Sequence, residues 1–482
     1  MNKYLLAVMV SLTLINTGFA GKLELDMDQA IQLALKNNVN MQNAQEDLLK
    51  AKAQRKEAFS SALPVLSAFG QVSHSFAIGV QPLSFPVPFG VLDENGNPVH
   101  YLTNPNDPAS FQQLIGENGM PVPNRYLQQT GIMMVPLELA FGSDNTMVYG
   151  LSLTQPIFEG RVIAAIRGAN VYGDLAMSAA DVTRLSVIEN TKKAFYSVLL
   201  ADRMVSVMQN SLEVMERNLA NVTALFEQGR TAEFDVIRAD VQVANQTTMV
   251  SNARKMKELA YARFKRNCGL DIDQEIITVG KLRTEIDTDI NLEELERKLI
   301  SNQPMLSQLE ANVKLMKENI LMVKAEFMPS IALTGSYQEM KSYNDNGYAD
   351  ANFNESSSLA LGFNMPIFNG FGSTARVQKA KADYRKSEYQ QLDVRENLLL
   401  ELKSIYLSIQ ESSRKIEAGL KGVKQAHKGV DMAQRLYQQG MASQLQVLDA
   451  QNASDQAELG LYQAYFEYNS ARASLARALG EE

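Results

Sequence analysis

The sequence has one cysteine, three histidines and no tryptophan among its 482 residues. The lone cysteine, Cys268, excludes an intramolecular disulfide and a cysteine-rich metal site, and three scattered histidines leave little for zinc chemistry. The charge is small as well: 46 basic against 54 acidic residues give −8, which is not the footprint of a nucleic-acid-binding protein. The motifs G-x-x-x-x-G-K-[ST], H-E-x-x-H and G-x-S-x-G do not occur. We therefore expect no enzyme, no metal site and no cofactor.

The first 20 residues have the pattern of a secretory signal peptide. Lys3 supplies a positive charge, an apolar run covers residues 5–15, and small residues lead to a predicted cut after Ala20. The alternative, a membrane anchor, would need about 20 apolar residues. No later stretch is apolar for long enough to span a bilayer as a helix. The mature chain is predicted to be exported without a transmembrane helix, with Cys268 as a buried small hydrophobe.

The sequence repeats itself. The segment TQPIFEG at 154–160 returns as NMPIFNG at 364–370, and FEQG at 226–229 returns as YQQG at 437–440. The dipeptide at 268–269 has its counterpart at 479–480, again 211 residues later, whereas the Leu-Pro at 63–64 pairs with the Met-Pro at 328–329, 265 residues later. Each half therefore has the same predicted order of helix, strand, loop, strand, long helix, glycine turn and helix. The difference between the two offsets locates one insertion, inside the first strand–strand loop.

This order predicts the organisation of the chain. A signal peptide occupies 1–20, a first structural repeat 21–270, a linker or equatorial segment 271–290, and a second structural repeat 291–482. The predicted fold class is α+β, with an internal tandem repeat of strand pairs and long antiparallel helical hairpins.

The long helices are indicated by their apolar period. No proline occurs between residues 160 and 229, and an apolar seam with steps of three and four runs from Val198 to Phe226. A second seam, with smaller residues, runs from Ile409 to Tyr437. Such spacing is typical of coiled-coil packing. Antiparallel return helices are expected at about 233–268 and 443–478, after glycines that suit the left-handed residue at a helix end.

The strand candidates have one large apolar face. Residues 147–155 and 357–365 alternate large apolar residues with small or polar ones, and the segment after Pro329 does the same. Such strands fit either a half-buried soluble sheet or a barrel with lipid outside, and about ten residues is the length of a tilted transmembrane strand. Export and the lack of another partner layer favour the barrel. Because four strands cannot close and open edges are forbidden in lipid, several chains must contribute.

Residues 79–146 differ in composition from the rest of the chain. Nine of the fourteen prolines lie here, together with Asn-Gly turns at 95–96 and 118–119. The segment shows neither helical nor strand periodicity. We therefore expect a long irregular surface loop at the extracellular end of the first strand pair.

With these motifs the chain resembles the TolC family of outer-membrane efflux proteins. The resemblance rests on the doubled Pro-Ile-Phe-x-Gly, on the tips FEQG and YQQG, and on the run VLDA at 447–450. It implies a homotrimer in outer-membrane lipid, with a twelve-stranded β-barrel continuous with a twelve-helix α-barrel that extends far into the periplasm. It also implies a passive exit duct for efflux or type I secretion, docked on a periplasmic adaptor protein and an inner-membrane pump. The exported cargo does not follow from it.

The resemblance further implies a gate at the periplasmic end. Tyr437 matches the gate tyrosine, Asp235 the gate aspartate, and Asp449 one carboxylate of an acidic ring around the pore. Two positions depart from the family pattern, since Ala442 stands where a gate arginine may occur and Gln446 where a second ring aspartate may occur. Closure is therefore expected to depend less on the arginine and to present fewer charges. Plain seam packing for Tyr437 and a solvated helix carboxylate for Asp449 are the alternative interpretations.

The turns at the ends of the hairpins are the expected docking site for the adaptor. The residues concerned are Gly229 and Arg230 at the first tip, and Gly440 and Met441 at the second. A competing interpretation is a soluble periplasmic coiled-coil adaptor, which would need one hairpin between two glycine-rich β-half-domains, whereas this sequence predicts two hairpins. A third, a secreted structural protein, gives no reason for strands with an apolar face.

Overall fold

The computed structural model describes residues 23–78, 80–92, 98–102, 111–113, 128–140, 142–286, 290–344, 351–439 and 441–482. The predicted signal peptide and Gly440 lie outside the described residues. The chain divides into two compact units. The helical unit takes the described residues of Met1–Ser60, Gly160–Phe327 and Ile367–Glu482, and the β unit takes those of Ser61–Glu159 and Met328–Pro366. Each unit draws on both halves of the sequence.

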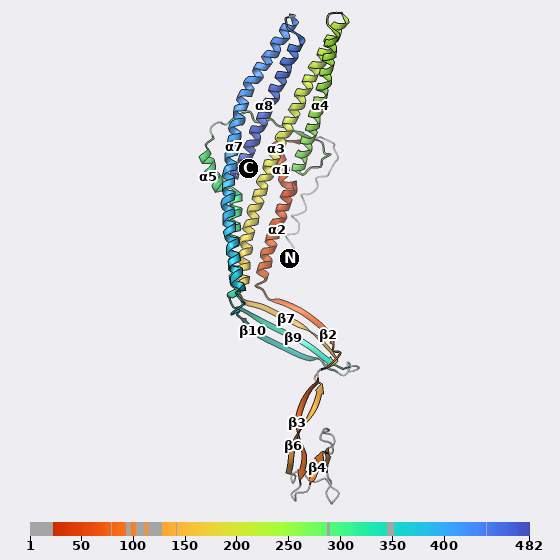
Figure 1. Ribbon diagram of the computed structural model, residues 1–482, viewed down its shortest axis with the longest axis vertical. Coiled ribbons are helices and arrows are strands. Elements are labelled where there is room, and N and C mark those ends of the chain that lie inside the picture. The colour runs from red at the N-terminus through yellow and green to blue at the C-terminus, as the bar shows by residue number, and fades with distance from the viewer. Residues whose placement is uncertain are drawn as a thin grey trace, which may run out of the picture. The chain divides into compact units, whose positions relative to one another are not determined.

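Two long antiparallel hairpins form the helical unit (Figure 1). Helix α3 (Gly160–Glu227) packs against α4 (Glu233–Cys268), and α7 (Gly372–Gln438) packs against α8 (Gln444–Leu479). The bounds agree with the predicted helices to within about two residues, and α3 alone reaches about 100 Å at 1.5 Å per residue. The predicted seams are confirmed where they are most apolar, since Val198, Val222, Ile409 and Ile416 are buried.

Shorter helices continue the layer beside the long ones. Helices α1 (Met27–Asn37) and α2 (Val39–Ser60) accompany the first hairpin, and α5 (Leu292–Asn302) and α6 (Pro304–Lys324) accompany the second. A short helix η3 (Ala325–Phe327) follows α6, and strands β1 (Leu23–Leu25) and β8 (Ile276–Thr278) form a parallel pair. Asp26 and Gln29 form a capping box that fixes the start of α1. Among the described residues, no helix combines the length and apolarity that a membrane crossing requires.

The same side-chain cap closes both return helices. The Asn38 amide donates to the Asn267 carbonyl at the end of α4, at 2.8 Å, and the Gln303 amide donates to the Ala478 carbonyl at the end of α8, at 2.9 Å. Both capping residues follow a short helix, α1 or α5. These bonds satisfy carbonyls that have no partner inside the helix, and they hold α1 and α5 against the helix ends.

A glycine in the left-handed region ends each return helix at the same place. Gly269 has φ +66° and Gly480 has φ +73°. A Cβ at Gly269 would lie 2.5 Å from the Asn37 carbonyl oxygen, and one at Gly480 would lie 2.5 Å from that of Asn302. Glycine is therefore required here both by conformation and by close backbone approach.

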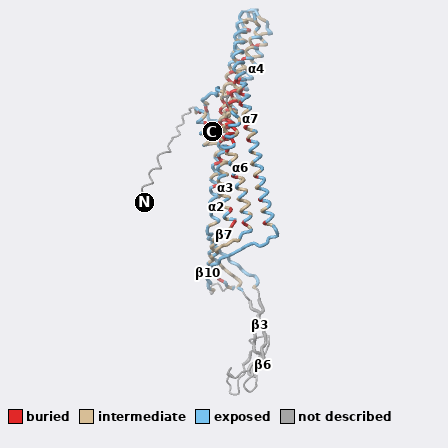
Figure 2. The backbone as a smooth tube through the Cα atoms, turned by 90° about the vertical axis from the view of Figure 1, so that its left-hand side faces the viewer, coloured by how far each residue is buried: buried red, intermediate tan, exposed pale blue. Residues whose placement is uncertain are grey.

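The buried side chains form two clusters, one in each hairpin. Phe195 and Phe264 meet edge to face in the first, where Cys268 is completely buried, and Leu402 and Tyr468 lie in the second. Burial raises the pKa of the Cys268 thiol to about 12. Its predicted role as a small hydrophobe is thereby confirmed. Figure 2 shows the buried residues concentrated on the helices near the C-terminus.

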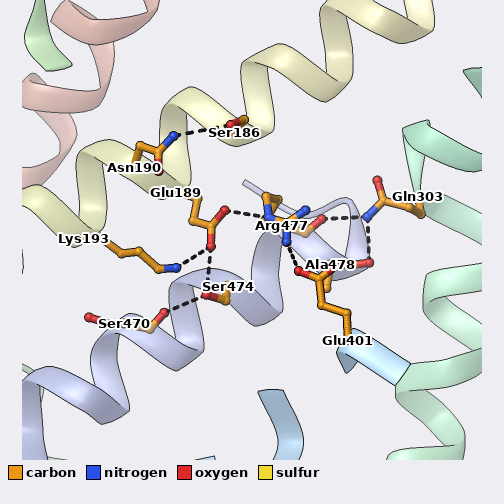
Figure 3. Close-up of polar contacts among 10 residues, drawn as sticks. All are labelled: Ser186, Glu189, Asn190, Lys193, Gln303, Glu401, Ser470, Ser474, Arg477 and Ala478. Carbon is orange, nitrogen blue, oxygen red and sulfur yellow. Dashed lines mark hydrogen bonds and ion pairs between the residues drawn. The ribbon is translucent and has the colours of Figure 1, made fainter. Parts of the chain in front are cut away.

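A polar network joins the two hairpins (Figure 3). The Glu189 carboxylate on α3 pairs with Arg477 on α8 at 2.6 Å, accepts a hydrogen bond from Ser474 at 2.8 Å, and pairs with Lys193 at 2.7 Å. Arg477 also pairs with Glu401 on α7. Burial raises the pKa of Glu189, but the hydrogen bonds from Lys193 and Ser474 and the charge of Arg477 outweigh it and hold this pKa below its ordinary value.

The β unit contains an antiparallel four-stranded sheet in the order β10-β9-β7-β2. Its strands are β2 (Val65–His74), β7 (Asn145–Glu159), β9 (Ser330–Tyr343) and β10 (Asn354–Asn364). The register places the predicted large apolar residues on one face, since opposite residues of a ladder share a face. The predicted residues on that face are Met147, Tyr149, Leu151, Leu153, Leu333, Tyr337, Leu359, Leu361 and Phe363, and Leu66 and Val72 of β2, which the sequence did not predict, join them. The same face carries the charged residues Glu339, Lys341 and Glu355 at one end of the strands. Leu66 on the edge strand β2 and Leu359 and Leu361 on the opposite edge strand β10 are 68–73% exposed, so the described residues leave both edges of the face largely uncovered.

The prediction of an irregular loop over residues 79–146 is wrong for most of the described part. A second sheet occupies it, in the order β5-β4-β3-β6, with β3 (Val80–Leu92), β4 (Pro98–Leu102), β5 (Phe111–Gln113) and β6 (Gln128–Ala140). The number of prolines argued against strands in this segment. In the β3–β6 ladder, however, Pro82, Pro86 and Pro88 of β3 and Pro136 of β6 all lie in alternate residue pairs. In alternate pairs the N–H positions point away from the partner strand, so a proline there removes no ladder hydrogen bond.

Candidate functional site

The first hairpin tip is a tight glycine turn. Gly229 has φ +72°, and a Cβ there would meet nothing within 4 Å. The Arg230 N–H donates to the Leu225 carbonyl at 2.8 Å, which satisfies an end carbonyl of α3. At the second tip the Met441 N–H donates to the Leu436 carbonyl at 2.9 Å in the same way. Both turns end a long helix and start its return helix, as the sequence predicts.

The tips expose both apolar and basic side chains. Arg230 is exposed, Met441 is 67% exposed, and Phe226 and Phe234 flank the first turn at 41% and 62%. The described residues leave a large part of each of these side chains exposed. An exposed methionine and phenylalanines are groups that gain free energy when a partner buries them.

The two predicted gate residues Asp235 and Tyr437 line one cavity. It has a volume of about 420 Å³ and lies between the start of α4 and the turn that joins α7 to α8. Its lining consists of Thr231, Asp235, Arg238, Ala239, Gln242, Tyr437, Ser443, Gln444, Leu445 and Leu448. The structure thus brings together two residues that lie about 200 positions apart and belong to different hairpins.

Within this cavity Asp235 has a local partner. The Thr231 hydroxyl donates to its carboxylate at 2.8 Å, which fixes the side chain in the first turn of α4, where a negative charge is favoured by the helix dipole. The Tyr437 hydroxyl forms no hydrogen bond with any described residue. Tyr437 is half-buried, as its place at the end of the seam predicts.

The two remaining gate candidates, Gln446 and Asp449, lie on α8 and differ in their hydrogen bonding. Gln446 is part of a capping box: its side chain accepts from the Ser443 N–H at 2.9 Å, and its own N–H donates to the Ser443 hydroxyl at 3.4 Å. Asp449, one turn further on, is exposed and forms no ion pair or hydrogen bond with a described residue. Gln446 therefore caps the start of α8, whereas the Asp449 carboxylate has no partner among the described residues.

Sequence reasoning missed five polar residues that line the cavity, namely Thr231, Arg238, Gln242, Ser443 and Gln444. Arg238 lies one turn after Asp235 on the same helix face, with its guanidinium 4.6 Å from the Phe234 ring centre. Gln242 and Gln444 each have a buried side-chain atom, Oε1 and Nε2 respectively, without a hydrogen-bond partner in the described chain. Arg238 could have been predicted from the sequence, because a residue three positions after Asp235 lies on the same helix face. No local sequence pattern indicates the two glutamines.

Two long antiparallel helical hairpins and a four-stranded sheet with an apolar face are the elements that the resemblance to outer-membrane efflux proteins implies. The family model described as "Outer membrane efflux protein" matches residues 137–287 and 295–481. The chain belongs to this family. It is an outer-membrane protein, which confirms the predicted class and location.

Individual relatives and solved structures agree with this family assignment. The chain is 25% identical over 358 residues to "Outer membrane protein TolC" of Escherichia coli, covering 70% of each sequence. It is 20% identical over 333 residues to "Alkaline protease secretion protein AprF" of Pseudomonas aeruginosa, covering 69% of each. Among solved structures, the Campylobacter jejuni CmeC outer membrane channel matches with TM-score 0.71 at 17% identity, covering 94% of this chain and 85% of that one. Vibrio cholerae VceC matches with TM-score 0.67 at 15% identity, covering 94% and 96%. These likenesses favour the channel over the soluble adaptor.

Proposed function

We propose that this protein is the passive exit duct of a tripartite efflux or type I secretion system. The duct would open at its periplasmic end when an adaptor and an inner-membrane pump dock on it. The observation that carries the proposal is the β unit: a four-stranded sheet with one exposed apolar face and with both edge strands, β2 and β10, unpaired within the described chain. Hydrocarbon is the environment that suits such a face, and unpaired strand edges cannot remain in hydrocarbon.

Closure of the sheet then requires further copies of the chain. Three copies would supply twelve strands, and their hairpins would form a coaxial helical barrel on the periplasmic side. The matched caps at Asn267 and Ala478 and the matched glycines Gly269 and Gly480 support a tandem repeat, in which each copy contributes two equivalent sixths to the ring.

The hairpin tips are the proposed contact with the adaptor, and the cavity of Asp235 and Tyr437 is the proposed gate. Each tip presents exposed side chains that a partner can bury, among them Arg230 at the first tip and Met441, which is 67% exposed, at the second. The gate cavity spans two hairpins, so a movement of one hairpin away from the other would separate its two walls. Asp449 of three copies would form the acidic ring.

Single-channel recording tests the duct. Purified protein in mild detergent is expected to be a homotrimer and to give discrete conductance steps in planar bilayers. A monomer or dimer as the sole species, or a mature protein that stays soluble without detergent, would contradict the proposal.

The docking part has its own test. Met441→Glu is expected to reduce co-purification of adaptor and pump while trimers and conductance are retained, because a charge replaces an apolar contact. Leu420→Glu, an exposed leucine on α7 about 20 residues from the tip, is the matched control. If adaptor and pump co-purify equally with wild type and Met441→Glu, the second tip is not the docking site. The proposal that the protein is a duct would not be affected by that result.

A further inference from the structure

A second cavity lies in the helical unit, away from the hairpin tips. It has a volume of about 1020 Å³ and lies between α3, α8 and the segment that follows β8. Helix α3 contributes Leu199, Asp202, Arg203 and Ser206; α8 contributes Leu461, Tyr462 and Tyr465; the segment contributes residues 278 and 280–285. Its size is that of a site for a small molecule.

One wall of this cavity is apolar and aromatic, and a cation is held against it. The Arg203 guanidinium lies 4.7 Å from the centre of the Tyr462 ring, and the Tyr462 and Tyr465 rings are neighbours at 6.5 Å. The Arg203 Nε is buried and has no hydrogen-bond partner among the described residues. A buried guanidinium N–H without an acceptor is costly, and a ligand that supplies an acceptor would relieve that cost.

The segment that covers the cavity adds two further cations. Asn469 of α8 fixes this segment, because it accepts from the Arg283 N–H at 3.2 Å and donates to the Arg283 carbonyl at 3.1 Å. Lys281 is exposed and forms no ion pair with a described residue. Arg283 lies 4.0 Å from Glu285, which is 88% exposed, so that pair is weak.

The acidic residues nearby do not cancel this positive charge. Asp202 is engaged within the first hairpin, where Lys257 pairs with it at 2.9 Å and the Tyr261 hydroxyl donates to it at 3.0 Å. Glu458 lies 3.5 Å from a terminal nitrogen of Arg203 and is shared with His427 at 3.0 Å. Lys281 thus lines the cavity without an ion pair to a described residue, and the Arg203 side chain, 42% exposed, lines it with only the 3.5 Å contact to Glu458 as its ion pair.

We propose that this cavity binds a small, flat, apolar anion, such as an aromatic carboxylate or sulfonate. The ring would lie against Tyr462 and Tyr465, and the acid group would accept from the accessible terminal nitrogens of Arg203, whose side chain is 42% exposed, and lie near Lys281. Charge-assisted hydrogen bonds of this kind are stronger than neutral ones. The bound anion would touch α3 and α8 together, and therefore would bridge the two hairpins. The proposal does not depend on the duct function.

Equilibrium dialysis of the full-length protein in mild detergent tests this site. The probe is 1-naphthalenesulfonate, and 1-naphthalenemethanol is the uncharged probe of similar shape. We expect saturable binding of one sulfonate per chain and about tenfold weaker binding of the alcohol, since the latter cannot supply an anionic acceptor. Arg203→Gln should weaken sulfonate binding about tenfold and Lys281→Gln about threefold.

The control variant is Lys424→Gln, an exposed lysine of α7 that lines neither cavity and has no ion pair with a described residue. It should bind the sulfonate as wild type does. Because Lys281 is exposed, Lys281→Gln is expected to fold. It therefore tests the site even if Arg203→Gln does not fold. Equal binding of sulfonate and alcohol, uptake that does not saturate, or wild-type affinity in Lys281→Gln would each overturn the proposal.

Discussion

Glu189 on α3 and Arg477 on α8 form a 2.6 Å ion pair across 288 positions of sequence, and this pair links the two helical hairpins. The carboxylate is buried, and Arg477 reaches Glu401 on α7 with its other nitrogen. One guanidinium therefore holds three long helices at a fixed distance (Figure 3). In a duct whose gate cavity spans the same two hairpins, such a link would confine hairpin movement to the region nearer the tips.

Removal of this link should destabilise the protein. Glu189→Gln leaves the size of the side chain unchanged but removes the charge that faces Arg477 and Lys193, and the expected loss is about 1–3 kcal/mol. Thermal unfolding in detergent measures it. Lys421→Gln is the control, because its pair with Glu417 joins residues four apart on an exposed helix face; no measurable change is expected there. A Glu189→Gln protein as stable as this control would show that the ion pair is energetically neutral.

The same carboxylate predicts a response to acid. Its pKa is lower in the folded protein than its ordinary value of 4.5. Glu189 therefore contributes stability that is fully present above about pH 4.5 and is lost as the pH falls through the folded value. The difference in unfolding midpoint between wild type and Glu189→Gln should be constant from pH 6 to 8 and should shrink below pH 4.5. A difference that stays constant into acid would contradict the assignment.

Two glycines with the same backbone conformation should differ in their tolerance of alanine. Gly269→Ala must accommodate both a left-handed φ and a backbone oxygen 2.5 Å from its Cβ, and the expected cost is about 2–4 kcal/mol. Gly229→Ala meets open space and should cost about 1–2 kcal/mol, from the conformation alone. Unfolding midpoints of the two variants give the comparison. Equal losses would mean that the approach to Asn37 relaxes without cost.

The acidic ring proposed for Asp449 predicts cation selectivity in the resting duct. Three carboxylates about 6–8 Å apart, at an effective dielectric near 40, would repel by roughly 1 kcal/mol per pair, which the assembly can tolerate. Asp449→Asn should reduce cation selectivity and block by divalent ions added from the periplasmic side, as read from reversal potentials in planar bilayers.

Asp431→Asn is the matched control for that recording. Asp431 is an exposed aspartate of α7, nine residues before the second turn, as Asp449 is nine residues after it. If Asp449→Asn behaves as wild type does, Asp449 is a solvated helix carboxylate and the ring is absent.

Much of the fold follows from local pattern. The long helices, their turns and the alternation of three of the four central strands, β7, β9 and β10, depend on residue spacing within one element, and two copies at constant offset reinforce the helices and turns. The seam from Val198 to Phe226 predicts α3 because a period of three and four can be read without knowledge of any partner. The same holds for Gly229, whose turn is a property of neighbouring residues.

The sequence by itself therefore determined the helical hairpins, the apolar-faced strands and the buried Cys268. Tertiary structure alone decided that residues 80–140 contain strands, because only the ladder shows Pro82, Pro86 and Pro88 at positions that need no donor. It also decided which distant groups meet: Arg238, Gln242 and Gln444 around the gate cavity, and Glu189 with Arg477. Such pairings arise from the packing of one hairpin on another, and no period within a single element contains that information.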